Sequence, residues 1–177
     1  MPSSTLIVYA HPSPHKSRVN RHLFQAATSL DFVTGRDLYE CYPHFYVDIA
    51  VEQQLLRQYE VIVFQFPLYW YSAPALLKEW VDTVLTRGFS YGEGERALKN
   101  KSFMLAVTTG GGVEAYNEEG LHGAALTSYL APLEQTARFC DMKIEKPFIV
   151  QGAGDLTRKE VNAIEKQYQK HLSEIGG

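Results

Sequence analysis

Residues able to bind a ligand or take part in a reaction are concentrated in three short segments. His11 to Asn20 contains histidine, serine and asparagine side chains, Phe66 to Ser72 contains four aromatic rings, and Thr108 to Gly112 contains two threonines and three glycines. The part from Ser17 to Asn20 offers main-chain amides, a hydroxyl and the positive end of a helix dipole, which together suit a phosphate group. Glycine lets the main chain approach a ligand closely. Each segment also has a plainer interpretation: a capped helix start, a dimer interface and a turn.

Other motifs with recognisable chemistry are weak or missing. His11 and His15 stand four residues apart, but they flank prolines on a loop and no third ligand is evident, so we predict no metal site. Neither GxGxxG nor GxxxxGK[ST] occurs, which leaves a Rossmann fingerprint and a nucleotide-hydrolysing P-loop unsupported. Tyr116 and His122 lie in a polar stretch, and on residue type alone they are surface loop residues.

Length and composition exclude several classes of protein. With 177 residues, of which 45% are hydrophobic, we expect one folded domain over residues 1–177. The net charge of −3 and the lack of a basic stripe argue against a nucleic-acid partner. The two cysteines have no CxxC spacing, and the first residues do not form a secretory signal. No uncharged stretch is long enough to span a bilayer, so we expect a cytoplasmic protein.

Apolar runs and helical spacings alternate along the chain. Short apolar runs predict strands at Thr5–Ala10, Phe32–Asp37, Val61–Gln65, Ser102–Thr108 and Lys143–Val150. Apolar residues three and four apart predict helices that follow Ser17 as a cap, cover 76–85 behind Pro74, cover 126–137, and cover 161–175 behind a Thr157–Glu160 capping box. The stretches 39–51 and 87–101 are expected to be long irregular loops.

This order of strands and helices predicts a doubly wound α/β domain. Right-handed crossovers bring the strands into a parallel sheet with helices on both faces. Ligands of such sheets bind at the carboxyl ends of the strands. The three segments described above follow predicted strands at those ends, so we expect them to meet at one edge of the sheet.

Taken together, the segments make the chain resemble the flavin-dependent NAD(P)H:quinone reductases of flavodoxin-like fold. It is most similar to their short bacterial members, which serve glutathione-gated potassium-efflux systems as ancillary proteins. The residues that carry the resemblance are LIVYAHP at 6–12, FQFPLYWY at 64–71, PALLKEW at 74–80, FSYG at 89–92 and TTGG at 108–111. The resemblance implies a five-stranded parallel sheet of order 2-1-3-4-5.

The resemblance also implies a flavin site. Residues matching the family's flavin contacts are His11, Ser17, Arg18, Val19, Asn20, Pro67, Leu68, Tyr69, Trp70, Tyr71, Thr108, Thr109, Gly110 and Gly111. The stretch 116–123 resembles the animal quinone reductases, whose matching tyrosine and histidine lie beside the flavin N1 and O2 edge, so Tyr116 and His122 are the implied catalytic residues. Those animal enzymes continue beyond the last helix, whereas this sequence ends at Gly177. We therefore expect FMN, with FAD as the alternative.

The implied reaction is two-electron hydride transfer from NADH or NADPH through the flavin to a quinone. An alternative is a regulatory ancillary subunit that activates a potassium-efflux transporter at the inner face of the membrane, with the flavin as redox sensor. A one-electron carrier is a third interpretation, which His11 to Pro14 disfavours because such carriers have a hydroxyl-rich loop there. Aromatic residues at Phe66, Tyr69, Trp70, Tyr71, Phe89 and Tyr91 exceed what a monomer surface usually exposes, so we predict a homodimer.

Overall fold

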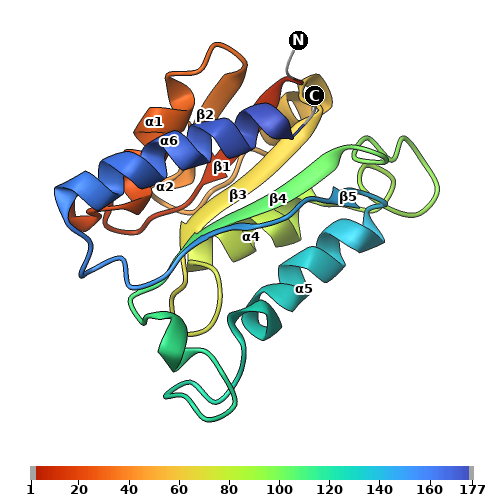
Figure 1. Cartoon of the computed structure of the whole chain (residues 1–177). Coiled ribbons are helices and arrows are strands. Elements are labelled where there is room, and N and C mark those ends of the chain that lie inside the picture. The colour runs from red at the N-terminus through yellow and green to blue at the C-terminus, as the bar shows by residue number, and fades with distance from the viewer. Residues whose placement is uncertain (1–2, 176–177) are drawn as a thin grey trace.

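The computed structural model describes residues 3–175 and has a parallel β-sheet at its centre (Figure 1). Its strands are β1 (Thr5–Tyr9), β2 (Val33–Asp37), β3 (Val61–Pro67), β4 (Ser102–Thr108), β5 (Lys143–Ile144) and β6 (Phe148–Val150). They follow the order β2-β1-β3-β4-β5, and β6 also pairs with β4. All pairings are parallel. The predicted flavodoxin-like fold and strand order are confirmed.

The edge beside β4 differs from the prediction, because the expected single strand Lys143–Val150 forms two short strands. Phe103 is opposite Ile144 and Ala106 is opposite Phe148, so three steps along β4 match four steps along its partner. The extra residue forms a bulge next to Pro147, which has no amide hydrogen for the ladder. The sheet therefore has six strands among the described residues instead of five.

Helices cover both faces of the sheet (Figure 1). Helices α1 (Asn20–Thr28) and α6 (Arg158–Glu174) pack together on one face. The opposite face carries α3 (Ile49–Gln58), α4 (Ala75–Val84) and α5 (Leu126–Phe139), with the short α2 (Leu38–Cys41) near the end of β2. Two single-turn 3₁₀ helices, η1 (Pro14–Lys16) and η2 (Val113–Ala115), lie in loops after β1 and β4. None of the helices within residues 3–175 combines the length and apolar character needed to cross a membrane.

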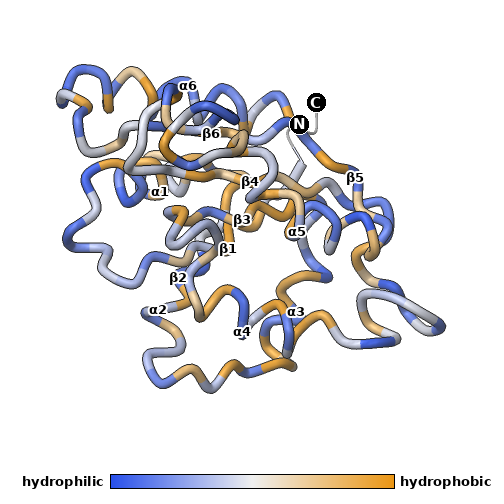
Figure 2. The backbone as a smooth tube through the Cα atoms, turned by 90° about the horizontal axis from the view of Figure 1, so that it is seen from below, coloured by the Kyte–Doolittle hydropathy of each residue, from blue (hydrophilic) through white to orange (hydrophobic). Residues whose placement is uncertain are grey.

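The core has two halves because alternate strand residues face opposite sides. Leu6 and Val8 pack toward α3, α4 and α5, whereas Ile7 and Tyr9 pack toward α1 and α6. Strands buried on both faces are apolar throughout, which explains the continuous hydrophobic runs in the sequence. In Figure 2 hydrophobic colouring runs through the central strands and recurs in segments of the surrounding helices.

Two local predictions about helices need correction. Ser17 is not the N-cap of α1: the 3₁₀ turn η1 delays the helix, and Val19 takes the cap position. The stretch 39–51, expected to be irregular, contains most of α2 and the start of α3, which Asp48 caps by accepting a hydrogen bond from the Val51 amide. The Thr157–Glu160 capping box is confirmed, as is the irregular course of 87–101.

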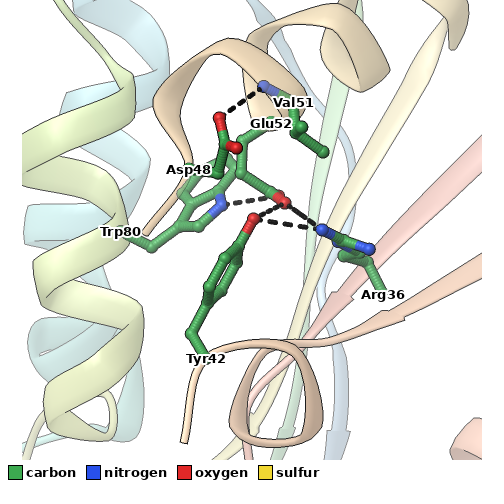
Figure 3. A network of polar contacts seen from close by, with 6 residues as sticks. All are labelled: Arg36, Tyr42, Asp48, Val51, Glu52 and Trp80. Atoms are coloured by element: carbon green, nitrogen blue, oxygen red, sulfur yellow. Dashed lines mark hydrogen bonds and ion pairs between the residues drawn. The ribbon is translucent and has the colours of Figure 1, made fainter. Parts of the chain in front are cut away.

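The buried side chain of Glu52 contacts polar side chains from several elements (Figure 3). Glu52 of α3 is completely buried and accepts hydrogen bonds from Arg36 Nε (2.9 Å), the Tyr42 hydroxyl (2.6 Å) and Trp80 Nε1 (2.8 Å). Burial raises the pKa of Tyr42 to about 12, and its bond to the carboxylate acts in the same direction. This cluster links β2, α3 and α4 with Tyr42, the residue that follows α2, at one point in the core. Trp80 is itself completely buried.

Candidate functional site

The three segments singled out in the sequence meet at the carboxyl ends of β1, β3 and β4, around a cavity of about 220 Å³. The residues that line it are His11, Lys16, Ser17, Arg18, Val19, Asn20, Pro67, Leu68, Tyr69, Thr108, Thr109, Gly110, Ala153 and Gly154. Of the predicted cofactor residues, only Trp70, Tyr71 and Gly111 are outside this lining. We call this space the strand-end cavity.

A fourth segment, which the sequence interpretation missed, completes the cavity. Ala153 and Gly154 follow β6, whose carboxyl end lies at the same edge of the sheet. The Thr109 amide donates to the Val150 carbonyl, and the Ala153 amide donates to the Thr109 carbonyl, both at 2.9 Å. Lys16 is a further lining residue that was not singled out. The rule that ligands bind at strand ends, applied to the last strand, would have identified Ala153 and Gly154.

The segment before α1 is arranged to attract an anion. The main-chain amides of Arg18, Val19 and Asn20 donate to no acceptor among the described residues. Ser17 Oγ accepts a hydrogen bond from the Arg21 amide at 3.0 Å, which leaves the hydroxyl hydrogen available to a ligand. Lys16 and Arg18 are exposed at the cavity, and no aspartate or glutamate from residues 3–175 lines it. Amides, cations and the helix dipole therefore act in the same direction.

His11 presents a hydrogen-bond donor at the cavity. Its side chain is buried, and burial lowers the pKa of the imidazole below its ordinary value, so the ring is neutral at neutral pH. Nδ1 accepts a hydrogen bond from the Ser13 amide at 3.0 Å. The proton of the neutral ring is therefore on Nε2. The ring also makes an edge contact with Tyr69, with 6.1 Å between the ring centroids.

Hydrogen bonds tie the second and third segments to the first. The Leu68 amide donates to the Thr108 carbonyl at 2.8 Å, which continues the β3–β4 ladder into the loops. Asn20 Nδ2 donates to Thr108 Oγ1 at 2.9 Å, and Thr109 Oγ1 donates to the Gly111 carbonyl at 2.7 Å. These bonds fix the positions of the lining residues relative to one another.

An aromatic turn projects from the end of β3. Tyr69 and Ser72 exchange two main-chain hydrogen bonds of 2.9 and 3.0 Å around Trp70 and Tyr71. Both central residues are left-handed, with φ of 47° and 64°, as a type I′ turn requires. The Trp70 side chain is 92% exposed.

The aromatic residues predicted to form one surface are thus divided between surface and core. Phe66 and Phe89 are buried, and their predicted exposure is wrong. Phe66 lies on the same strand face as Phe64 and packs in the core half that contains α3, α4 and α5. The Arg57 guanidinium covers the Phe89 ring, with 5.0 Å between its central carbon and the ring centroid. Tyr91 is half-buried and contacts the exposed Phe139. The exposed rings at this edge are therefore Tyr69, Trp70 and Tyr71.

Tyr116 and His122 lie together beside the cavity. Their rings are 4.4 Å apart, and the Tyr71 hydroxyl is 3.3 Å from His122 Nδ1. A Cβ added to Gly111 would lie 3.0 Å from His122 Nε2 and 3.2 Å from Tyr116 Cε2, so the pair packs directly on the Thr108–Gly111 loop. Tyr129 donates to the His122 carbonyl at 2.6 Å. Burial raises the pKa of the Tyr116 phenol above its ordinary value, so the hydroxyl keeps its proton at neutral pH.

Larger surface cavities occur elsewhere on the protein. We nevertheless select the strand-end cavity as the candidate site, because ligands of parallel sheets bind at the carboxyl ends of the strands. One of about 550 Å³ lies between α1 and α6, and another of about 580 Å³ lies between α1 and the segment after β2. Acidic side chains line both, with Glu165 in the first and Asp37 in the second. The strand-end cavity differs in having cations, free amides and glycine together.

Comparison with known proteins agrees with the fold. A family model described as flavodoxin-like fold matches residues 3–172. The chain belongs to this flavodoxin-like family. The curated relatives of this flavodoxin-like protein include the glutathione-regulated potassium-efflux system ancillary protein KefG of Pectobacterium atrosepticum, which is 45% identical over 97% of this chain and 94% of that protein. KefG of Cronobacter sakazakii is 44% identical over the same shares of the two chains.

Solved structures similar to this flavodoxin-like protein include flavin and quinone proteins. General stress protein 14 of Treponema denticola, in complex with FMN, superimposes with a TM-score of 0.91 and 36% identity over 96% of this chain and 97% of that one. An NADPH-quinone reductase of P. pentosaceus superimposes with a TM-score of 0.88 and 31% identity over 98% and 99%.

Proposed function

We propose that the protein is an FMN-dependent NAD(P)H:quinone oxidoreductase. The observation that carries this proposal is the strand-end cavity, in which free amides, two cations and hydroxyl donors converge and which no acidic side chain of the described residues lines. Support comes from two similar structures, one titled as an FMN complex and the other as an NADPH-quinone reductase. NADH and NADPH both remain candidate donors.

The residues of the cavity fit the parts of FMN. Ser17 to Asn20, with Lys16 beside them, would hold the phosphate through amides, hydroxyl and charge. Thr108 to Gly110 and Pro67 to Tyr69 would hold the sugar chain and the ring system. FAD is the alternative cofactor, and its larger nucleotide half would extend past this lining.

When bound, FMN would supply the hydride chemistry between NAD(P)H and a quinone. Tyr116 and His122 would hold a hydrogen bond to the ring edge on which negative charge develops, and the imidazole would exchange the proton with solvent. The exposed Trp70 and Tyr71 rings would bound the place where the two planar substrates enter. Tyr71 would also hold His122 in position through its hydroxyl.

Cofactor content is the first test. We expect the purified protein to be yellow and to release FMN on heating, as identified by chromatography. A colourless protein that binds neither FMN nor FAD in titration would overturn the proposal. Steady-state oxidation of NADH and NADPH with menadione then identifies the preferred donor.

Stopped-flow kinetics test the two catalytic residues. In matched holoenzymes, we expect Tyr116→Phe and His122→Ala to slow flavin reduction by NAD(P)H while FMN stays bound, because general acid–base assistance is worth about 10²- to 10⁴-fold in total. Ser17→Ala should act oppositely and weaken FMN retention with little effect on reduction. Tyr46→Phe, at an 88% exposed tyrosine, is the control. Reduction of the double variant at the wild-type rate would show that Tyr116 and His122 are only loop surface.

A second candidate function follows from the KefG relatives. Similarity over nearly the full length of both chains supports a role as ancillary subunit of a membrane potassium-efflux transporter, at the inner face of the cell membrane. Potassium loss from cells that produce the Pectobacterium transporter, with and without this chain, tests that role. Activation by wild type and equally by the Tyr116→Phe, His122→Ala double variant would separate regulation from turnover. Unchanged efflux would count against it.

We also propose a homodimer in which Tyr69, Trp70 and Tyr71 contact a second copy. Three exposed rings on one turn, with Leu121 86% exposed in the loop that carries His122, support an interface beside the strand-end cavity. Such a contact would help to exclude water from the place where substrates enter. Sedimentation velocity at micromolar concentration should give a dimer. A monomer of 20.0 kDa would contradict the proposal.

A further inference from the structure

A buried chain of polar side chains runs from α6 to the strand-end cavity. The Tyr168 hydroxyl donates to Gln65 Oε1 at 3.0 Å, and Gln65 Nε2 donates to the Asn20 carbonyl at 2.8 Å and to Asn20 Oδ1 at 3.1 Å. Asn20 Nδ2 then donates to Thr108 Oγ1 at 2.9 Å. None of these four residues is more than 5% exposed. Only Asn20 and Thr108 line the cavity.

The direction of every hydrogen bond in this chain follows from one fixed group. The main-chain carbonyl of Asn20 can only accept, so the amide nitrogen of Gln65 must face it and Gln65 Oε1 must face Tyr168. The same nitrogen requires Asn20 to turn its oxygen toward Gln65 and its nitrogen toward Thr108. Within this series of hydrogen bonds, Thr108 Oγ1 is then the acceptor for Asn20 Nδ2. Its hydroxyl hydrogen has no acceptor among the residues that the structure describes.

From this arrangement we infer that Gln65 and Tyr168 are positioning residues that direct the Thr108 hydroxyl to donate its hydrogen to the bound cofactor. Asn20 occupies one of the two acceptor positions of Oγ1, while the hydroxyl hydrogen has no acceptor among the described residues. Because Thr108 is buried, an acceptor atom of a ligand in the cavity would satisfy this hydrogen. The ligand atom that it meets is therefore an acceptor, such as a sugar hydroxyl oxygen or a ring carbonyl of a flavin. This inference rests on the proposed function.

Removal of the Tyr168 hydroxyl tests the inference at a distance from the ligand. In Tyr168→Phe, Gln65 Oε1 loses its donor while the packing of the ring on Phe148, at 4.7 Å, is kept. We expect FMN to bind about 3- to 10-fold more weakly, which corresponds to the loss of one intramolecular hydrogen bond. Quenching of FMN fluorescence on titration with apoprotein measures the dissociation constant. Tyr59→Phe, which removes a hydroxyl that donates to Thr34 at 2.8 Å at the far end of the sheet, should leave it unchanged.

A double-mutant comparison separates positioning from general loosening of the fold. If Tyr168 acts through Thr108, Tyr168→Phe should have no further effect on FMN affinity in a Thr108→Val background. Thermal unfolding of each apoprotein shows whether the variants are folded. Should Tyr168→Phe fail to fold, Gln65→Met, which keeps the length of the side chain and removes its three side-chain hydrogen bonds, replaces it in the same comparison.

The outcomes assign failure to one proposal or the other. Wild type that binds no flavin overturns both the proposed function and this inference. Two results would overturn the positioning role alone, provided that wild type binds FMN. In the first, the FMN dissociation constant of Tyr168→Phe is within a factor of 1.5 of the wild-type value. In the second, Tyr168→Phe weakens FMN binding equally in the wild-type and Thr108→Val backgrounds.

Discussion

Glu52→Gln is the substitution for which the structure gives the sharpest expected loss of stability. The change keeps the shape of the side chain but replaces a carboxylate by a neutral amide at a completely buried position. Three donors, from Arg36, Tyr42 and Trp80, converge on the two carboxylate oxygens (Figure 3). An amide can offer an acceptor to only one side of this cluster, so at least one donor loses its partner.

The magnitude follows from which partner is lost. If the amide nitrogen faces Trp80, the buried indole N–H is left unsatisfied, which costs about 1–3 kcal/mol. Arg36 in addition loses the charge that its guanidinium contacts at 2.7 Å. Breaking a buried ion pair on one side costs about 3–5 kcal/mol, and the 25% exposure of the Arg36 side chain places this case toward the lower end. We therefore expect the free energy of unfolding to fall by about 3–4 kcal/mol.

Urea unfolding of the apoprotein at pH 7 measures this loss. Glu60→Gln is the matched control, because Glu60 is 66% exposed and lies 3.8 Å from Lys101. We expect that change to alter stability by less than about 0.5 kcal/mol. If Glu52→Gln loses less than 1 kcal/mol, the carboxylate does not contribute as a buried charge and the reasoning is refuted.

Three further predictions concern single residues. The Tyr9 hydroxyl is buried without a hydrogen-bond partner in the described chain, so Tyr9→Phe should raise the free energy of unfolding by about 1 kcal/mol, and a loss in urea unfolding would refute this. Burial lowers the pKa of His11 below 6.5, so the unfolded chain takes up its proton first and stability falls as the pH drops below that value. His11→Asn should make the urea midpoint fall less between pH 7 and pH 5 than it does in wild type, and equal falls would contradict it. Gly111→Ala should displace His122 and Tyr116 and lower quinone turnover while FMN affinity stays within about two-fold; unchanged turnover would show that the pair can shift freely.

Much of the fold could be predicted because the sequence pattern of the central strands is local and easily recognised. The cores of β1, β3 and β4 are continuous apolar runs with β-branched residues, and they end at proline or at glycine-rich loops. Helix α3 was missed because one of the two residues it buries is Glu52, which hides the helical spacing of apolar residues. The partners that make this burial tolerable come from three other elements, and no local pattern contains them.

The sequence predicts which loops form the candidate site, but not the exposure of single side chains or the buried hydrogen bonds behind it. The strand-end rule places His11, Pro67 and Thr108 together, and the structure brings all three to one cavity. The exposure of individual rings depends on strand register and loop packing, which is why Phe89 was misplaced. The buried link from Tyr168 to Gln65 joins residues 103 positions apart, so only the folded chain reveals it.

The turn at Trp70 and Tyr71 is a place where substitutions would raise the thermal stability of the protein. Left-handed residues other than glycine cost about 1–3 kcal/mol each, and Asn-Gly is the preferred pair for such a turn. A library selected for survival at high temperature should therefore favour Trp70→Asn with Tyr71→Gly. The same change deletes both exposed rings and the contact of Tyr71 with His122. Under the proposed function these rings bound the place where substrates enter, so stability and activity would be opposed at this turn, and a selection that counts only folded protein would lower turnover.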